Sequence, residues 1–212
     1  MCLLAIAFQS HPDAPLIVTS NRDEFYARPT LPMHWWSDAP ILAGRDTQAG
    51  GTWMGLSQDG RFAAVTNFRQ MVNGVMPAAK TLSRGELITD FLSSDQSAEE
   101  WADSLTATMA DYSGFNLLLY DGFNLLYLNN HDNSRKLLPP GIYALSNHLL
   151  DSPWPKVDHA RDQLKQAISP VKMGAEQLPN LIATLSLEKV YAPELLPNTG
   201  VPAQWEELLS SP

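Results

Sequence analysis

Residues 2–29 read CLLAIAFQSHPDAPLIVTSNRDEFYARP, and this stretch decides the fold. Two short apolar runs, residues 3–8 and 16–18, are rich in branched side chains and bounded by turn formers, which predicts two buried strands. If the strands pair as a hairpin, the polar residues 21–24 return to the sheet edge where Cys2 begins. Ionised groups are rarely buried without partners, so this meeting predicts a functional site. The plainer alternatives are a buried hydrophobic cysteine and a solvated polar turn.

Composition narrows the classes of protein to consider. The chain has 212 residues, 44% of them hydrophobic, a net charge of −9 and one cysteine. These values predict a single domain over residues 1–212, with two small domains as the alternative, and argue against a nucleic-acid or anionic-membrane surface. One cysteine excludes an internal disulfide and fits a reducing compartment. With neither a signal-peptide pattern nor a run of ~20 apolar residues, we expect a cytoplasmic protein without a membrane span.

Further strands and helices follow in two rounds. Asp59-Gly60 and Asp121-Gly122 each stand between apolar runs and predict hairpins. Residues 30–38 are expected to form a loop. Helices are predicted after capping boxes at 83–86 and 97–100, and again over 154–168, 175–185 and 204–209. The order of strands, helices, strands and helices predicts an α+β fold, a four-layer αββα sandwich of mainly antiparallel sheets.

The chemistry available at Cys2 depends on Met1. If Met1 is removed, Cys2 carries a thiol and a free amine, and the amine can act as base for the thiol. Arg22 would favour the thiolate by charge, and Asp23 would orient the amine. Asn67 and Asn147 each end a predicted strand and are candidates to donate to an oxyanion, with turn capping as the alternative.

Several motifs together resemble one family. They are Met1-Cys2, residues 21–24 with Arg28-Pro29, Trp36, residues 44–46, residues 50–55, Thr66-Asn67, Arg84-Gly85, residues 114–117, Gly141-Ile142, and residues 146–147 with 154–156. The chain resembles the transport and Golgi organisation family, also called the NRDE family, as a bacterial-type member. The resemblance implies a fold similar to the N-terminal-nucleophile hydrolases. It also implies a role in haem trafficking or in handling acyl-lipid metabolites. Because family members continue past the region matching residues 209–211, we expect a chain that is short at its C-terminus.

The residues around this pattern suggest a ligand site. Tryptophans offer flat apolar walls, the glycine pair at 50–51 permits close approach by a ligand or a backbone, and arginines can hold a carboxylate or phosphate. The candidate ligand-binding residues are Asn21, Glu24, His34, Trp36, Arg45, Gly51, Trp53, Arg69 and His148. Axial haem ligands would come from Met33, His34, His148 or Cys2. The histidines show no metal-ligand spacing, so no metal site is predicted.

Three functions therefore stand side by side. The first is a protein that binds and traffics haem or a related acyl-lipid metabolite, with haem as a ligand rather than a resident cofactor. The second is an enzyme, a C–N amide hydrolase with Cys2 as N-terminal nucleophile. The third is a non-catalytic interaction module. Retention of Met1 separates the second from the others, because it blocks the amine.

Overall fold

The computed structural model describes residues 2–69, 71, 75, 77–78, 80–169, 172–186 and 191–210. The chain divides into two compact units that alternate along the sequence. Unit 1 comprises Met1–Asp23, Arg69–Pro77 and Pro139–Pro212, and unit 2 comprises Glu24–Phe68 and Ala78–Leu138.

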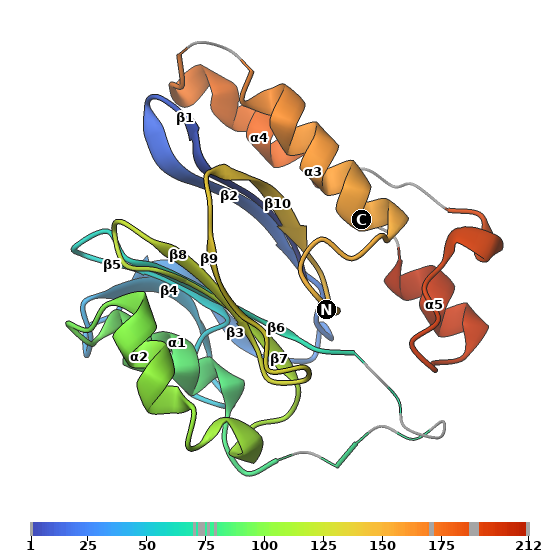
Figure 1. The fold of residues 1–212 in the computed structure, drawn as a ribbon, viewed down its shortest axis with the longest axis horizontal. Coiled ribbons are helices and arrows are strands. Elements are labelled where there is room, and N and C mark those ends of the chain that lie inside the picture. The colour runs from blue at the N-terminus through green and yellow to red at the C-terminus, as the bar shows by residue number, and fades with distance from the viewer. Residues whose placement is uncertain are drawn as a thin grey trace. The chain divides into compact units, whose positions relative to one another are not determined.

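Unit 1 is built on a three-stranded antiparallel sheet in the order β10-β1-β2. Its elements are β1 (Cys2–His11), β2 (Ala14–Arg22), β10 (Gly141–Leu145), α3 (Pro155–Ala167), α4 (Leu178–Ala183) and α5 (Ala203–Leu209), with 3-10 turns η2 (Ala175–Gln177) and η3 (Pro193–Leu195). In Figure 1, α3 and α4 lie over one face of this sheet. The predicted hairpin of residues 2–22 is confirmed, with Cys2 opposite Arg22 in the register.

The apolar run CLLAIAF forms β1, the central strand of this sheet, and both faces of the strand are buried. Leu3, Ala5 and Ala7 pack with residues of α3 in the core of unit 1. Leu4 and Ile6, which point to the opposite face, are also fully buried. A strand buried on both faces needs the near-continuous apolar sequence found here.

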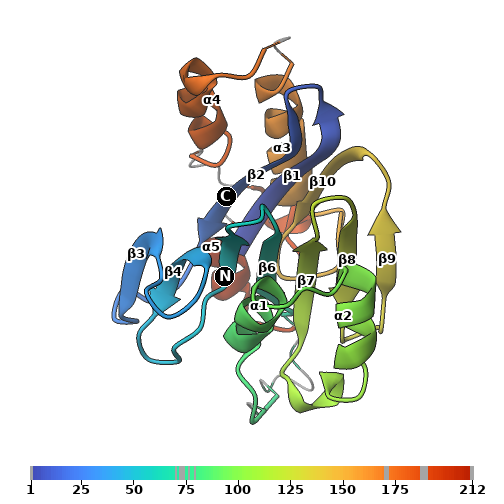
Figure 2. The same cartoon turned by 90° about the vertical axis from the view of Figure 1, so that its left-hand side faces the viewer.

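Unit 2 is a seven-stranded antiparallel meander in which each strand pairs with the next along the chain. Its strands are β3 (Thr30–Trp35), β4 (Ile41–Asp46), β5 (Met54–Ser57), β6 (Phe62–Asn67), β7 (Phe115–Tyr120), β8 (Leu125–Asn129) and β9 (Arg135–Leu138). The helices are α1 (Arg84–Leu92) and α2 (Ala98–Leu105), followed by the 3-10 turn η1 (Met109–Asp111). Figure 2 shows the strands side by side with α1 and α2 in front. Leu87, Phe91 and Trp101 pack from the helices onto the sheet.

Both Asp-Gly hairpins are confirmed. β5 pairs with β6 and β7 pairs with β8, each antiparallel. Gly60 and Gly122 adopt φ values of 85° and 100°, the left-handed region that glycine enters without steric cost. The Asp121 carboxylate accepts the N–H groups of Phe123 and Asn124, which closes the second turn.

Four local predictions were wrong or incomplete. Residues 30–35 form the edge strand β3 rather than a loop, because an edge position tolerates Pro32 and pairing with β4 satisfies the backbone. Strand β9 was not predicted, since only Leu138 of its four residues is buried. Ser83 makes no side-chain cap, whereas Ser97 forms the predicted capping box with Glu100. Helix α3 begins at Pro155, one residue after the predicted start at Trp154.

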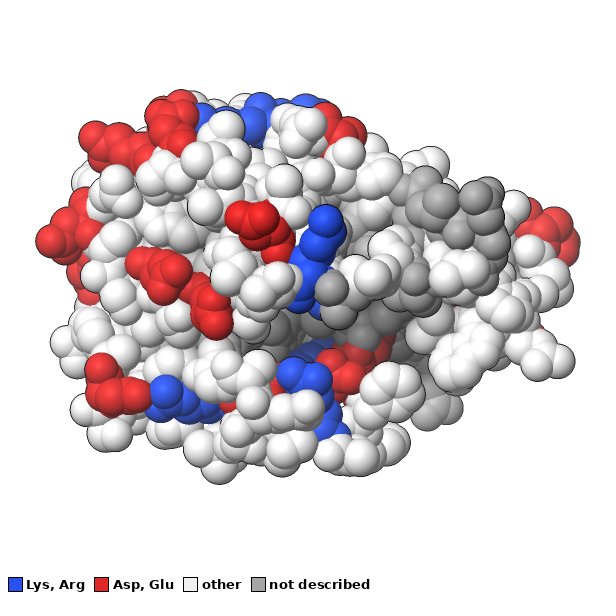
Figure 3. Space-filling view, turned by 90° about the horizontal axis from the view of Figure 1, so that it is seen from below, with Lys and Arg blue, Asp and Glu red and all other residues white. Residues whose placement is uncertain are grey.

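Helices and antiparallel sheets together confirm the predicted α+β class. Within the described residues, no helix is both long and apolar enough to cross a membrane. On the face drawn in Figure 3, lysines and arginines stand among acidic side chains and form no continuous patch.

Candidate functional site

Cys2 lies at the head of the central strand of unit 1, where the sequence predicted it. Its side chain is buried, with 9% exposed. The backbone N–H of Asp23 donates to the thiol, and the charges of Arg22 and Asp23 both act on it. The prediction that Arg22 or Asp23 lies within reach of Cys2 is therefore confirmed.

The surroundings of Cys2 keep its thiol protonated at neutral pH. Its pKa is raised to about 11, mainly because burial disfavours the thiolate, and the Asp23 carboxylate adds to this. Arg22 and the Asp23 N–H pull the pKa down without cancelling the effect of burial. A reaction at sulfur therefore needs a base. The free amine of Cys2 would supply one after removal of Met1, which lies outside the described residues.

Asn147 is the second predicted site residue that unit 1 brings to Cys2. It follows β10 and is fully buried. Ser146 links the two, since its hydroxyl donates to the Cys2 carbonyl at 3.1 Å and lies 3.4 Å from the Asn147 Oδ1. The Asn147 carbonyl accepts the N–H of Arg69 at 2.7 Å, which brings Arg69 to the same cluster.

Lys156 belongs to this cluster and was missed as a site residue. It is 1% exposed, and its Nζ donates to the Leu209 carbonyl at 2.6 Å. Burial lowers its pKa to about 8, with Arg69 acting in the same direction and Asp23, Cys2 and Glu206 opposing. The sequence carried a signal. Lys156, Ala160 and Leu164 are spaced by four residues, which puts the lysine on the apolar face of α3.

Arg69 forms an ion pair with Glu206 of α5 at 2.9 Å, with both side chains less than 8% exposed. The Glu206 carboxylate also accepts the N–H and the hydroxyl of Thr199, at 2.7 and 2.5 Å. The Arg69 guanidinium lies 5.3 Å from the Trp154 ring centroid. Glu206 was not a predicted site residue, because nothing in a short amphipathic helix marks one glutamate as buried.

The other unit 1 candidates have structural partners. The Asn21 side chain donates to the Leu185 carbonyl at 2.8 Å and so ties β2 to the end of α4. The Nδ1 of His148 is 2.8 Å from the Ser152 hydroxyl, and its ring lies 5.3 Å from that of Trp154. His148 therefore sits next to Asn147 with its orientation fixed.

The remaining candidates lie in unit 2. They are Glu24, His34, Trp36, Arg45, Gly51, Trp53 and Asn67. Glu24 caps the N–H of Phe25, and His34 contacts the Pro32 carbonyl through Nδ1. Asn67 is exposed.

Trp36 and Trp53 pack in and against the core of unit 2. The Trp36 indole N–H donates to the Ala43 carbonyl at 3.2 Å. Arg45 covers the Trp36 ring at 4.1 Å and forms a two-pronged pair with Asp38.

The close approach predicted at the glycine pair is made by another backbone segment. A Cβ on Gly51 would lie 2.8 Å from the carbonyl carbon of Gly85, so only glycine fits where the chain entering β5 passes the start of α1.

A buried polar network occupies the sheet of unit 2 beside the exposed Asn67. Asn116 accepts from Tyr127 and Asn129 and donates to the Thr66 hydroxyl at 3.0 Å. The network is fully buried, and its bonds connect β6, β7 and β8. Satisfied networks of this kind rigidify a core and specify strand register.

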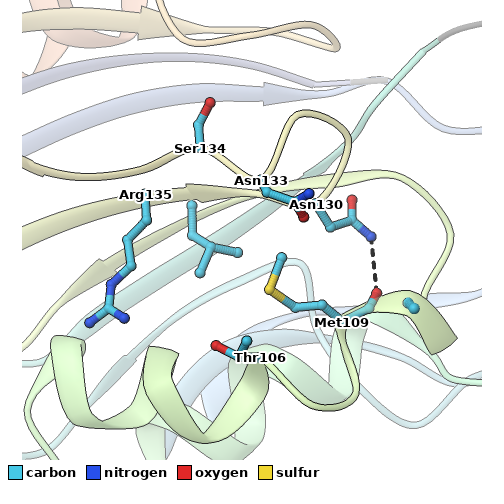
Figure 4. A pocket seen from close by; sticks show the side chains of 8 residues that line it. Thr106, Met109, Asn130, Asn133, Ser134 and Arg135 are labelled. Carbon is cyan, nitrogen blue, oxygen red and sulfur yellow. Dashed lines mark hydrogen bonds between the residues drawn. The ribbon is translucent and has the colours of Figure 1, made fainter.

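Unit 2 also contains a cavity of about 300 Å³, lined by Thr106, Met109, Ala110, Leu128, Asn130, Asn133, Ser134 and Arg135. Figure 4 shows the Asn130 amide turned to the Met109 carbonyl rather than into the space. Arg135 pairs with Asp103 and donates to the Glu99 carbonyl. The polar groups of Asn130 and Arg135, which line the cavity, are thus bonded to other parts of unit 2. Among the described residues, no three His, Cys, Asp or Glu side chains are placed to hold a metal ion.

Comparisons with known proteins agree with this fold. A family model described as Transport and Golgi organisation 2 matches residues 1–212. The chain is 34% identical to the Transport and Golgi organization protein 2 homolog of Bos taurus, over 98% of this chain and 78% of that protein. It is 33% identical to the Mus musculus homolog over the same shares, and 26% identical to the Drosophila melanogaster protein over 79% and 65%.

The comparison with solved structures includes a protein of similar fold. It is the Caenorhabditis elegans ortholog of N-acylethanolamine-hydrolyzing acid amidase, with a TM-score of 0.56 and 11% identity, over 88% of this chain and 86% of that one. The similarity confirms the predicted fold, which is like that of the N-terminal-nucleophile hydrolases.

Proposed function

Because this chain belongs to the Transport and Golgi organisation 2 family, we propose that it acts on a small amphipathic acyl metabolite, and that it hydrolyses a C–N amide bond with Cys2 as nucleophile. One observation carries the proposal. A buried thiol heads the central strand of unit 1 and receives the Asp23 N–H, with Arg22 opposite and Asn147 one residue beyond its Ser146 contact. The relative with a similar fold is named for hydrolysis of N-acylethanolamines, which supports an acyl amide as substrate class.

The reaction follows from these groups once Met1 is removed. The Cys2 amine takes the thiol proton, and the sulfur attacks the carbonyl carbon of the amide. The Asn147 side-chain N–H groups stabilise the oxyanion. The C–N bond then breaks, the departing amine takes the proton from the Cys2 ammonium, and an acyl-thioester remains. Water, deprotonated by the same amine, cleaves the thioester and releases the carboxylic acid.

Intact-mass spectrometry with N-dodecanoylethanolamine tests this proposal. We expect protein without Met1, a transient dodecanoyl adduct on Cys2 and release of free ethanolamine. Protein alkylated at its single cysteine is the matched control and should form no adduct. Processed protein that forms no adduct and releases no ethanolamine above the buffer rate would contradict the proposal.

Haem binding is the second candidate, and His148 favours it. Its Nδ1 contact with Ser152 fixes the ring, as partners of axial histidines do, and Trp154 offers an aromatic wall beside it. The role that the family resemblance implied, trafficking of haem or an acyl lipid, needs such a binding site. A cytoplasmic location suits either function and is supported by the single cysteine.

Titration with haemin should shift the Soret band and quench tryptophan fluorescence at a near-stoichiometric ratio. His148→Ala should then alter the band, whereas His34→Ala, in an exposed contact of unit 2, should leave it unchanged. Unchanged spectra in His148→Ala and Cys2→Ala would exclude ligation by these residues. A chain that neither turns over the amide nor binds haemin or dodecanoyl compounds would be a non-catalytic interaction module.

A further inference from the structure

Two buried cations near Cys2, Arg69 and Lys156, exchange no proton and form no bond in the proposed reaction. Arg69 reaches the site through its backbone, since its N–H donates to the Asn147 carbonyl and Ser146 connects Asn147 to Cys2. Lys156 interacts electrostatically with Cys2, Asp23 and Arg69. A buried charge is costly unless a partner meets it, so the partners of these two cations are informative.

Both partners come from the C-terminal part of unit 1. The Leu209 carbonyl accepts from Lys156 at 2.6 Å, and the Glu206 carboxylate pairs with Arg69 at 2.9 Å. In Figure 1, α5 lies beside the N-terminal end of α3, which agrees with these contacts. A further hydrogen bond holds the C-terminal part of unit 1, since the Met71 N–H donates to the Thr199 carbonyl.

This arrangement has the features of an anion-binding site that is occupied by a carboxylate of the same chain. A guanidinium suits planar recognition of a carboxylate, and here it lies against the Trp154 ring with a second cation nearby. Glu206 supplies the carboxylate from a helix of only seven residues. A ligand carboxylate presents the same chemical group and would compete with Glu206 for Arg69.

We propose that Arg69 and Lys156 form an anion subsite, that Glu206 of α5 occupies it in this structure, and that the carboxylate of an N-acyl amino acid displaces Glu206 when it binds. This inference rests on the proposed function, because it names the amide whose amine part carries the anion. It predicts a preference for N-acyl amino acids over neutral acyl amides. It also makes α5 an internal competitor that weakens binding of any anionic ligand.

Calorimetric titration with two probes of equal chain length tests the subsite. The probes are N-dodecanoylglycine, which carries a carboxylate, and N-dodecanoylethanolamine, which does not. In the wild-type chain the glycine conjugate should bind more tightly. Glu206→Gln should tighten its binding by about tenfold, the factor given by 1.4 kcal/mol, and leave the neutral probe unchanged. The control is Glu207→Gln, an exposed residue of the same helix with the same change of charge, and it should change neither affinity.

Equal affinity for the two probes in the wild-type chain, or an unchanged affinity of Glu206→Gln for the glycine conjugate, would overturn the inference. Because Glu206→Gln removes the carboxylate that pairs with the buried Arg69 guanidinium and can unfold the chain, hydrogen exchange of the wild-type protein gives a second readout. Saturating N-dodecanoylglycine should speed amide exchange in residues 191–210, where Glu206 holds the Thr199 N–H, and the neutral probe should not. Slower or unchanged exchange would contradict displacement.

These outcomes are independent of turnover. Binding of the anionic probe without hydrolysis would retain the subsite and reject the proposed amidase. Hydrolysis of both probes at equal affinity would retain the amidase and reject the subsite.

Discussion

Replacing Cys2 by serine should lower the turnover of N-dodecanoylethanolamine by about 10³-fold or more, the scale on which loss of a nucleophile is felt. The protein has one cysteine, so no other thiol can take over the reaction. A serine hydroxyl in the same buried position is far harder to deprotonate than a thiol whose pKa is about 11. Dodecanoyl binding and thermal stability should stay close to wild type, because the exchange of sulfur for oxygen is small and Cys2 makes no disulfide.

A second variant isolates the amine from the thiol. Insertion of a leucine between Met1 and Cys2 keeps the thiol on its strand but moves the terminal amine away from it. If the amine is the base, this variant should be as inactive as Cys2→Ser while still reacting with thiol reagents at high pH. Equal turnover by the wild-type chain and Cys2→Ala would reject nucleophilic catalysis by Cys2.

Replacing Lys156 by methionine should remove a rise in stability between pH 8 and 9. Burial lowers the pKa of Lys156 from 10.5 to about 8, so between these values the unfolded chain binds more protons than the folded one. The free energy of unfolding therefore rises with pH in this range, and this gain is lost as the pH falls toward 8. The whole shift corresponds to roughly 3 kcal/mol, of which on the order of 1 kcal/mol falls between pH 8 and 9.

Titration of the Cys2 thiol changes stability in the opposite direction to Lys156, and it sets the upper pH limit of this test. Its pKa is raised from 9.0 to about 11, so its contribution is present below pH 9 and is lost as pH rises toward 11. Urea unfolding at several pH values below 9 thus reports on Lys156. The control is Lys165→Met, an exposed lysine of the same helix, and it should keep the rise. Parallel curves for wild type and Lys156→Met would contradict a buried ammonium.

The same variant should lower amide turnover, because it removes a cation that interacts electrostatically with Cys2. The Lys156 ammonium favours the Cys2 thiolate by charge, whereas methionine does not. Turnover equal to wild type at every pH would show that Lys156 serves the fold alone.

The sequence determined the central hairpin, the two Asp-Gly turns and the meeting of Cys2 with Arg22 and Asp23. These features depend on local pattern, because a strand buried on both faces needs a continuous apolar run and a tight turn needs a residue that accepts positive φ. Pairing then follows from chain proximity, which places Arg22 opposite Cys2 once the turn is set. Asn147 could be expected at the end of a strand for the same reason.

Tertiary structure decided which charged residues are buried. Lys156, Arg69 and Glu206 come from segments up to 137 positions apart, as the numbers of Arg69 and Glu206 give by subtraction, and no local pattern links them. It also placed Trp36 and Gly51 in packing roles, because a tryptophan or glycine has the same local signature beside a ligand as beside another backbone. Burial depends on what the rest of the chain brings to a residue, so the anion subsite emerges only once α3, α5 and the strands are packed.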